Sequence, residues 1–196
     1  MSNLRETKKR ATRQAIADAA GRIYLAEGAE ALTVSHVAEQ AGISARTFHN
    51  YYSSVNACLC QFALDAASLI VDKVDEYPDT ASTTEIVEDI VRQGFRRNDP
   101  ELHSMTSLFM VMDYLEKASC TDVSREEAER VAEKIREVFA RRSPERDAFE
   151  VQVVLHACVA ASASATQEFF ALPAPRDPAQ GEELVRRAFA TLRSIT

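Results

Sequence analysis

Chain breakers are sparse along this chain. It holds five glycines and six prolines in 196 residues, and between them apolar residues recur at the three- and four-residue spacing of a helical face. The apolar run 151–159 has the composition of a buried strand, but it lies in a helix-length segment free of breakers. We therefore predict an all-α fold of about nine helices with short connections.

Capping residues set the expected ends of these helices. Gly28 and Gly42 are placed to end the first two helices, and Thr33 and Ser44 to cap the second and third. The starts of helices further along the chain are indicated by Asp99-Pro100, Ser143-Pro144 and Asp177-Pro178, and by a capping box of Ser124 with Glu127. The expected helices run from Thr12 to Glu27, from Thr33 to Gly42, from Ser44 to Tyr52, and over residues 55–77, 83–98, 100–118, 124–141, 144–171 and 178–195.

The stretch TVSHVAEQAGISARTFHNYY, residues 33–52, has the layout of a helix-turn-helix. Ala38 is small where two helices would cross, and Gly42 tolerates the positive φ of a tight turn. Ile43 is apolar inside that turn. With Phe48 and Tyr52 facing inward, the second helix would present Arg46, Thr47, His49 and Asn50 outward.

Those outward side chains suit duplex DNA. Arginine pairs bidentately with guanine in the major groove, and asparagine with adenine. Thr33 and Tyr51 are placed for the DNA backbone, and the free N–H groups at the Ser44 end of the second helix for a phosphate.

The charge distribution supports this interpretation, although the net charge of the chain is −7. Residues 1–13 carry five basic side chains and one acidic one. A basic arm on an acidic protein is typical of a phosphate-binding segment, but charged termini are also often merely solvated. We expect Lys8, Lys9, Arg10 and Arg13 to contact phosphates.

Residues 9–62 resemble the DNA-binding domain of the TetR family of repressors. The resemblance rests on IADAAGRIYLAEG at 16–28, ALTVSHVAEQAGIS at 31–44 and RTFHNYYSS at 46–54. It departs from the family at Val55, where lysine is usual, at His49, where tyrosine is commoner, and at Asn50. It implies DNA contacts from a set of matching positions, namely Thr33, Ser44, Arg46, Thr47, His49 and Tyr51, whereas Asn50 rests on helix geometry alone.

The resemblance also implies two domains. Residues 1–54 would be the basic arm and a three-helix DNA-binding domain, and residues 55–196 a helical ligand-binding and dimerisation domain. A pocket would draw on apolar and polar side chains of the second domain, although core packing is an alternative for each: Phe95, Met105, Phe109, Met112, Phe139, Gln152 and His156.

The last two helices are the expected dimer interface by the same resemblance, although both could pack within one chain. The first is rich in alanine and serine, and the second has an apolar stripe. The expected contacts are Ala157, Ala161, Ser164, Leu184, Ala188 and Leu192.

We therefore expect a homodimeric repressor, released from a palindromic operator by a small molecule of unspecified identity. The sequence leaves open a helical protein-binding adaptor and a helical enzyme. The enzyme is disfavoured because no Glu-x-x-His pair of a di-iron bundle occurs and no catalytic triad is recognisable.

No cofactor and no metal site is expected. The cysteines at 58, 60, 120 and 158 lack zinc-ligand spacing and are interpreted as buried thiols, with redox sensing as the alternative. No signal peptide and no apolar run of 18 residues is present, so we expect a cytoplasmic protein with no membrane partner.

Overall fold

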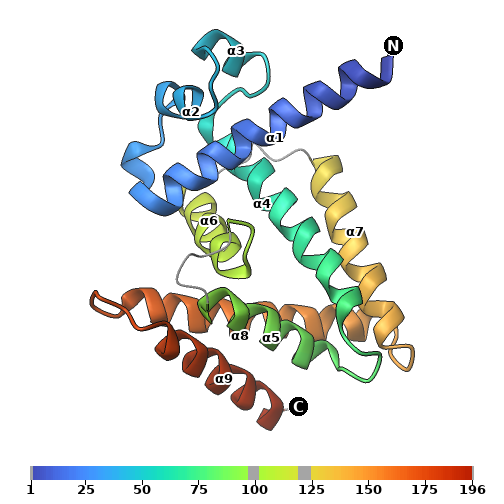
Figure 1. Cartoon of the computed structure of the whole chain (residues 1–196). Coiled ribbons are helices and arrows are strands. Elements are labelled where there is room, and N and C mark those ends of the chain that lie inside the picture. The colour runs from blue at the N-terminus through green and yellow to red at the C-terminus, as the bar shows by residue number, and fades with distance from the viewer. Residues whose placement is uncertain (1, 97–101, 119–124, 196) are drawn as a thin grey trace. The chain divides into compact units, whose positions relative to one another are not determined.

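The computed structural model describes residues 2–96, 102–118 and 125–195. Within these ranges the chain forms nine α-helices and two short 3₁₀ segments, and no strand (Figure 1). The predicted all-α class is therefore confirmed. The helices are α1 (Ser2–Glu27), α2 (Val34–Gln40), α3 (Ala45–His49), α4 (Val55–Asp72), α5 (Thr83–Arg96), α6 (Met105–Lys117), α7 (Arg125–Arg142), α8 (Ala148–Ala171) and α9 (Pro178–Ile195), with 3₁₀ segments at Ala29–Ala31 and Lys73–Glu76.

Three predicted caps are present. The Thr33 side chain accepts a hydrogen bond from His36 N at 3.2 Å, and Ser44 Oγ accepts one from Thr47 N at 3.0 Å. Asp177 caps α9 by accepting from Ala179 N at 2.9 Å. Each cap satisfies a backbone donor that has no partner inside the helix.

The predicted start of α8 is wrong. Ser143 Oγ is buried and lies 3.3 Å from Thr83 Oγ1, so it caps nothing. The helix begins four residues later, where Asp147 accepts from Glu150 N at 2.8 Å and the Glu150 carboxylate accepts from Asp147 N at 3.0 Å. This reciprocal capping box satisfies two donors at once, which a lone serine does not.

Other predicted ends differ by a few residues or lie outside the described ranges. α1 begins at Ser2, so the basic segment expected as an arm is helical. α4 ends at Asp72 and continues as the 3₁₀ segment Lys73–Glu76. The signals at Asp99-Pro100 and Ser124 fall outside the described residues.

Two compact units divide the chain: Met1–Asp65 with Met110–Ala128, and Ala66–Phe109 with Glu129–Thr196. We call them unit 1 and unit 2. Unit 1 contains the helix-turn-helix segment and part of α4, α6 and α7, and each of these three helices also contributes residues to unit 2. The domain boundary predicted at residue 54 stays a prediction.

The core of unit 1 joins α1 to the helix-turn-helix and α4. Ile16, Ala20 and Ile23 of α1 are buried, as are Val37 and Phe48. Gly21 permits a close approach, because a Cβ there would stand 2.6 Å from the ring of Phe62 on α4. Helix α1 is therefore packed directly on α4.

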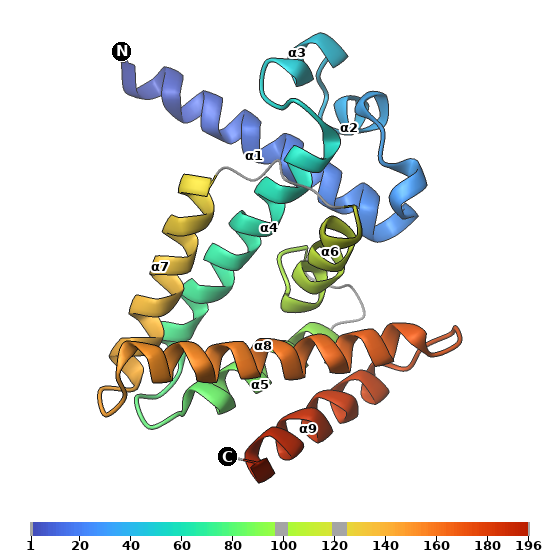
Figure 2. The same cartoon turned by 180° about the vertical axis from the view of Figure 1, so that it is seen from behind.

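The core of unit 2 is built mainly from α5, α8 and α9, which pack on one another (Figure 2). The Phe95 and Phe169 rings meet edge to face with centroids 4.9 Å apart. Such aromatic pairs add about 0.5–1.5 kcal/mol beyond the area they bury. Val185 and Phe189 of α9 are fully buried against this cluster.

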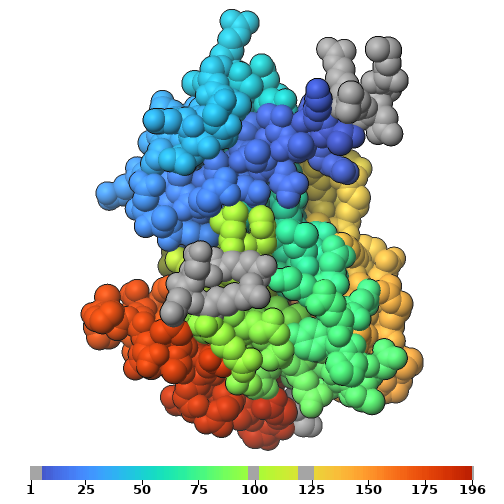
Figure 3. All heavy atoms as spheres, in the orientation of Figure 1, coloured from blue at the N-terminus to red at the C-terminus, as the bar shows by residue number. Residues whose placement is uncertain are grey.

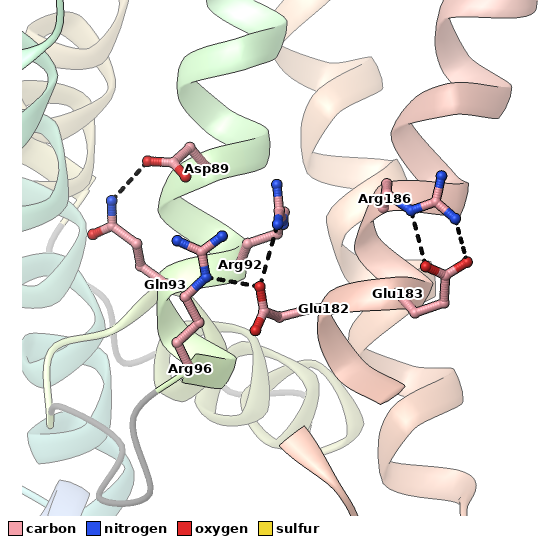
Figure 4. A network of polar contacts seen from close by, with 7 residues as sticks. All are labelled: Asp89, Arg92, Gln93, Arg96, Glu182, Glu183 and Arg186. Atoms are coloured by element: carbon pink, nitrogen blue, oxygen red, sulfur yellow. Dashed lines mark hydrogen bonds and ion pairs between the residues drawn. The ribbon is translucent and has the colours of Figure 1, made fainter. Parts of the chain in front are cut away.

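Ion pairs fasten α9 to α5 at the edge of this core. Arg92 and Arg96 of α5 both donate to Glu182 Oε2, at 3.3 and 2.7 Å (Figure 4). Arg193 of α9 donates to Glu88 at 2.6 Å. The pairs are partly exposed, so each contributes about 1 kcal/mol at most, and they orient α9 more than they stabilise it.

Two helices are long and apolar enough to pass a membrane-span test by length and composition. They are Val55–Glu76 and Ala148–Ala171, each with a mean hydropathy of 1.4. Core helices of globular proteins pass the same test, so this is weak evidence for a membrane.

Among the described cysteines, Cys58, Cys60 and Cys158 are buried free thiols, as predicted. Burial raises the pKa of Cys58 to about 12 and that of Cys158 to about 11. The thiolate is the reactive form of cysteine, so burial disfavours reaction of both thiols. Residue 120 lies outside the described ranges.

Candidate nucleic-acid interface

A tight turn joins α2 to α3. Gly42 N donates to Glu39 O at 3.0 Å, and Ile43 N donates to Ala38 O at 2.9 Å. Gly42 has φ +67°, a left-handed conformation that other residues rarely adopt, and the space around its Cα is open. The turn is therefore closed by backbone conformation, as the sequence predicted.

Helix α3 presents one polar face. Phe48 is fully buried and the Tyr52 side chain is only 4% exposed, whereas Arg46, His49 and Asn50 are exposed. Because Phe48 and Tyr52 anchor the inner side, the three polar side chains face solvent. Of the four side chains that the sequence predicted to face outward, Arg46, His49 and Asn50 are exposed and Thr47 is half-buried.

Two predicted contacts lie beyond the end of α3. The helix ends at His49, so Asn50 occupies its C-cap and the half-buried Tyr51 follows in a turn. Tyr51 N and Tyr52 N both donate to Phe48 O, at 2.9 and 3.0 Å. Tyr51 and Tyr52 are thus held to the last turn of α3 by backbone hydrogen bonds.

The capping hydroxyls keep hydrogen-bonding capacity. Thr33 Oγ1 is exposed and accepts from the His36 backbone, while Ser44 Oγ accepts from Thr47 N and lies 2.8 Å from Thr47 Oγ1. A hydroxyl that accepts still has a proton to donate. Thr33 and the Ser44–Thr47 pair therefore hold donors at the start of α2 and α3.

The basic residues of α1 fall into two groups. Lys8, Lys9 and Arg10 are exposed on α1, the helix that is coloured deep blue in Figure 3. Arg13 instead contacts its own unit: its Nη2 donates to Gln61 Oε1 at 2.9 Å and its guanidinium lies 5.0 Å from the centre of the Tyr52 ring. Phosphate contact by Arg13 stays a prediction.

Sequence reasoning missed the contacts that α6 makes in unit 1. Tyr24 OH donates to Met110 O at 3.1 Å, and Tyr114 OH donates to Asn56 Oδ1 at 3.2 Å. The two tyrosine rings lie 5.0 Å apart. Partners 58 and 86 residues apart leave no local spacing signal.

The residues predicted for a ligand pocket do not share one environment. Phe95 and Phe139 are in the core of unit 2, and Met105 and Phe109 pack partly against it. Gln152 and His156 are exposed, because the neighbouring Val151 and Leu155 turn inward. Met112 is 50% exposed and belongs to unit 1. The pocket stays a prediction.

Two buried hydroxyls of unit 2 escaped the sequence analysis. Within the described part of the chain, Thr106 Oγ1 and Thr166 Oγ1 are buried and have no hydrogen-bond partner. Thr106 Oγ1 lies against α5, since a Cβ at Gly94 would stand 2.7 Å from it. Buried hydroxyls without partners are costly and uncommon.

The residues expected at a dimer interface divide between core and surface. Ala161, Leu184, Ala188 and Leu192 pack partly against the core of their own unit, while Ala157 is half-buried and Ser164 is exposed. Helix α8 also leaves large apolar side chains exposed: Phe149 (73%), Val153 (49%) and Val159 (46%). The named contacts remain predictions.

No cluster of three metal-ligating side chains occurs among the described residues.

Comparison with known proteins matches the N-terminal segment to one family model. Residues 12–59 match the model of the bacterial regulatory proteins of the tetR family. No curated protein matches the chain by sequence.

Solved structures with this fold span nearly the whole chain. A structure described as a TetR-family transcriptional regulator from Mesorhizobium loti has 13% identity and a TM-score of 0.52, covering 95% of this chain and 97% of its own. The fatty acid degradation regulator FadR from Bacillus halodurans has 17% identity, a TM-score of 0.52 and coverage of 92% and 94%. FadR from Thermus thermophilus, a TetR-family repressor in complex with lauroyl-CoA, has 17% identity, a TM-score of 0.52 and coverage of 91% and 93%.

At these identities the structures establish a shared fold, and the sequence match covers the helix-turn-helix. Residues 12–59 are therefore similar to the DNA-binding domain of the tetR family of bacterial regulatory proteins, and the chain is a DNA-binding regulator with an all-helical fold.

Proposed function

We propose that this regulator is a homodimeric repressor that binds a palindromic operator and is released when a small molecule binds its C-terminal helices. The observation that carries the proposal is the exposed polar face of α3, held by the buried Phe48 and the Ser44 cap within the family-matched segment. Such a helix is the element that enters the major groove.

Roles for the predicted DNA-contacting residues follow from their chemistry. Arg46 pairs with a guanine edge, and Asn50 with an adenine edge, while Thr47 and His49 make neighbouring contacts. Thr33, Ser44 and Tyr51 contact phosphates, as do Lys8, Lys9 and Arg10 of α1. The phosphate contacts fix position, and the base contacts supply sequence preference.

A second copy of the chain would cover the apolar surface of α8. Phe149, Val153 and Val159 are exposed, and only 22% of the most apolar stretch of this helix is buried inside one chain. Burying apolar area contributes about 25 cal/mol per Å². A symmetric pair would place two α3 helices on two half-sites of one operator.

The effector is proposed to bind in unit 2. The unpartnered hydroxyls of Thr106 and Thr166 are the polar groups there that a ligand would satisfy. The complex of Thermus thermophilus FadR with lauroyl-CoA is a precedent for a small molecule bound by a protein of this fold.

Coupling would run through the helices that contribute residues to both units, α4, α6 and α7. A ligand shifts an equilibrium only by its differential affinity for the two states. A coupling free energy of about 1–3 kcal/mol would weaken operator binding ~5–150-fold. We propose no catalytic activity, and a location in the cytoplasm with the DNA.

The test is binding to a palindromic duplex from upstream of the gene of this protein, measured by fluorescence anisotropy at two salt concentrations. Arg46→Ala is expected to lower affinity and to relax base preference. Lys9→Ala is expected to weaken all sequences alike and to flatten the salt dependence. Arg146→Ala, which removes an exposed charge from a turn of unit 2, is the matched control. Wild-type binding by both interface variants would overturn the proposal.

A further inference from the structure

Arg13 is the one basic residue of the predicted phosphate-binding set that makes several contacts inside unit 1. We infer that Arg13 is a positioning residue, which holds the chain at the end of the recognition helix, and that it does not contact DNA. This inference rests on the proposed function, because it concerns how that DNA-binding surface is held.

The first observation is that Arg13 holds Tyr52 twice. Tyr52 OH donates to the backbone oxygen of Arg13 at 3.0 Å, and the Arg13 guanidinium lies over the Tyr52 ring at 5.0 Å from its centre. Tyr52 is 4% exposed and its own N–H donates to Phe48 O, the carbonyl near the end of α3. One residue of α1 therefore fixes the segment that leaves the recognition helix.

The second observation is that the guanidinium is already engaged. Its Nε and Nη2 both donate to Gln61 Oε1 on α4, at 3.3 and 2.9 Å. These two donors form one of the two edges with which arginine can grip a phosphate or carboxylate bidentately. With that edge occupied and Nη2 also near Glu127, only part of the guanidinium is left for a phosphate.

The acceptor on α4 is itself held in place. Gln61 Nε2 donates to Asp65 Oδ1 at 3.0 Å, which orients the amide so that its oxygen faces Arg13. Asp65, Gln61, Arg13 and Tyr52 thus form a polar chain from α4 to the end of α3. Glu127 Oε2 of α7 lies 3.7 Å from Arg13 Nη2. This carboxylate partly balances the positive charge of the guanidinium, which weakens its attraction for a phosphate.

The slope of log K against log salt concentration distinguishes positioning from phosphate contact. Loss of one phosphate contact reduces this slope by about 0.9. Loss of a positioning residue lowers affinity at every salt concentration and leaves the slope unchanged. It also lowers the ratio of operator to scrambled-duplex affinity, because α3 is misaligned on the bases, which a general loss of stability does not do.

The experiment uses the full chain and an operator duplex over a series of salt concentrations, with circular dichroism confirming that each variant is folded. For Arg13→Ala we expect affinity lowered roughly tenfold, a slope equal to wild type, and a reduced operator preference. Arg13→Lys keeps the charge but not the two-donor edge, so it should lose affinity nearly as Arg13→Ala does. A slope reduced by about 0.9 in Arg13→Ala, or wild-type affinity in Arg13→Lys, would overturn the inference.

Gln61→Leu provides a second, independent decision if Arg13 variants do not fold. It removes the acceptor and keeps Arg13, so we expect lower affinity at an unchanged slope, whereas a phosphate-binding Arg13 would be freed and affinity would hold or rise. Wild type and Lys9→Ala are measured in parallel. If the wild-type protein binds no duplex, the proposed function fails. If the wild type and Lys9→Ala behave as expected but Arg13→Ala flattens the slope, only the positioning role of Arg13 fails.

Discussion

The ring of Phe95 on α5 fills the place that a side chain at Gly181 on α9 would need. A Cβ at Gly181 would stand 2.3 Å from the nearest ring carbon, and real Cβ atoms do not approach that closely. The crossing of α5 and α9 therefore depends on the missing side chain.

Gly181→Ala is expected to destabilise unit 2. Overpacking a filled core costs about 1–3 kcal/mol. Alanine has a better helix propensity than glycine by about 1 kcal/mol, so over most of the 1–3 kcal/mol range the cost of overpacking is larger. Urea unfolding followed by circular dichroism measures the change. Phe95→Leu combined with Gly181→Ala should recover part of the loss, since the smaller side chain makes room; strict additivity of the two variants would contradict the contact.

Gly42→Ala is expected to destabilise the helix-turn-helix for a different reason. Nothing lies within 4 Å of the added Cβ, but the backbone has φ +67°, a conformation that costs an alanine about 1–2 kcal/mol. Gly42→Asn should cost less, because asparagine tolerates this region. Thermal unfolding would compare the two, and equal losses would show that the turn does not keep its left-handed conformation in solution.

Ser44→Ala should remove the cap of α3, and Ser44→Asp should keep it. Loss of an N-cap costs about 1 kcal/mol, so Ser44→Ala lowers both stability and operator affinity. Ser44→Asp retains stability but places a negative charge where a phosphate would bind, so only affinity falls. An Asp variant that binds operator as wild type does would remove Ser44 from the interface.

Features encoded within a few residues could be predicted from the sequence. The caps at Thr33 and Ser44 each bond an N–H three residues on, and the outward face of α3 follows from Phe48 alone. The start of α8 was missed because two signals compete there. Ser143-Pro144 satisfies the pattern, but Ser143 is drawn into a buried contact with Thr83, which leaves the cap to Asp147.

Long-range contacts could not be predicted in this way. Arg13 reaches Tyr52 and Gln61 across 39 and 48 residues, so its charge predicts phosphate binding while its packing predicts the opposite. Gln152 and His156 looked like inward polar groups, yet the phase of α8 around Val151 and Leu155 turns them outward. Local charge and polarity therefore indicate which residues could bind DNA or a ligand, whereas the tertiary packing determines which way their side chains face and what they contact.

The buried thiols predict a loss of stability at high pH. Burial raises the pKa of Cys58 to about 12 and that of Cys158 to about 11 from an ordinary value of 9.0. Above pH 9 the unfolded chain therefore releases these protons and the folded chain retains them, so the free energy of unfolding falls toward pH 11, by at most about 1.4 kcal/mol per pH unit for each thiol.

Cys158→Ala should reduce this pH dependence, because one titrating group is removed while lysines and tyrosines are unchanged. Urea unfolding of wild type and variant at pH 8 and pH 10.5 measures it. The difference between the two pH values should be smaller in the variant. Identical differences would show that Cys158 ionises in the folded protein.

The central claim, that α3 reads base edges through Arg46, is tested most directly by replacing operator guanines one at a time with 7-deazaguanine, which lacks the N7 acceptor. For wild type, one position per half-site should weaken binding by about 1–3 kcal/mol, while Arg46→Ala should be insensitive at that same position. If no guanine position discriminates between wild type and Arg46→Ala, Arg46 does not read a guanine and the proposed mode of recognition is contradicted.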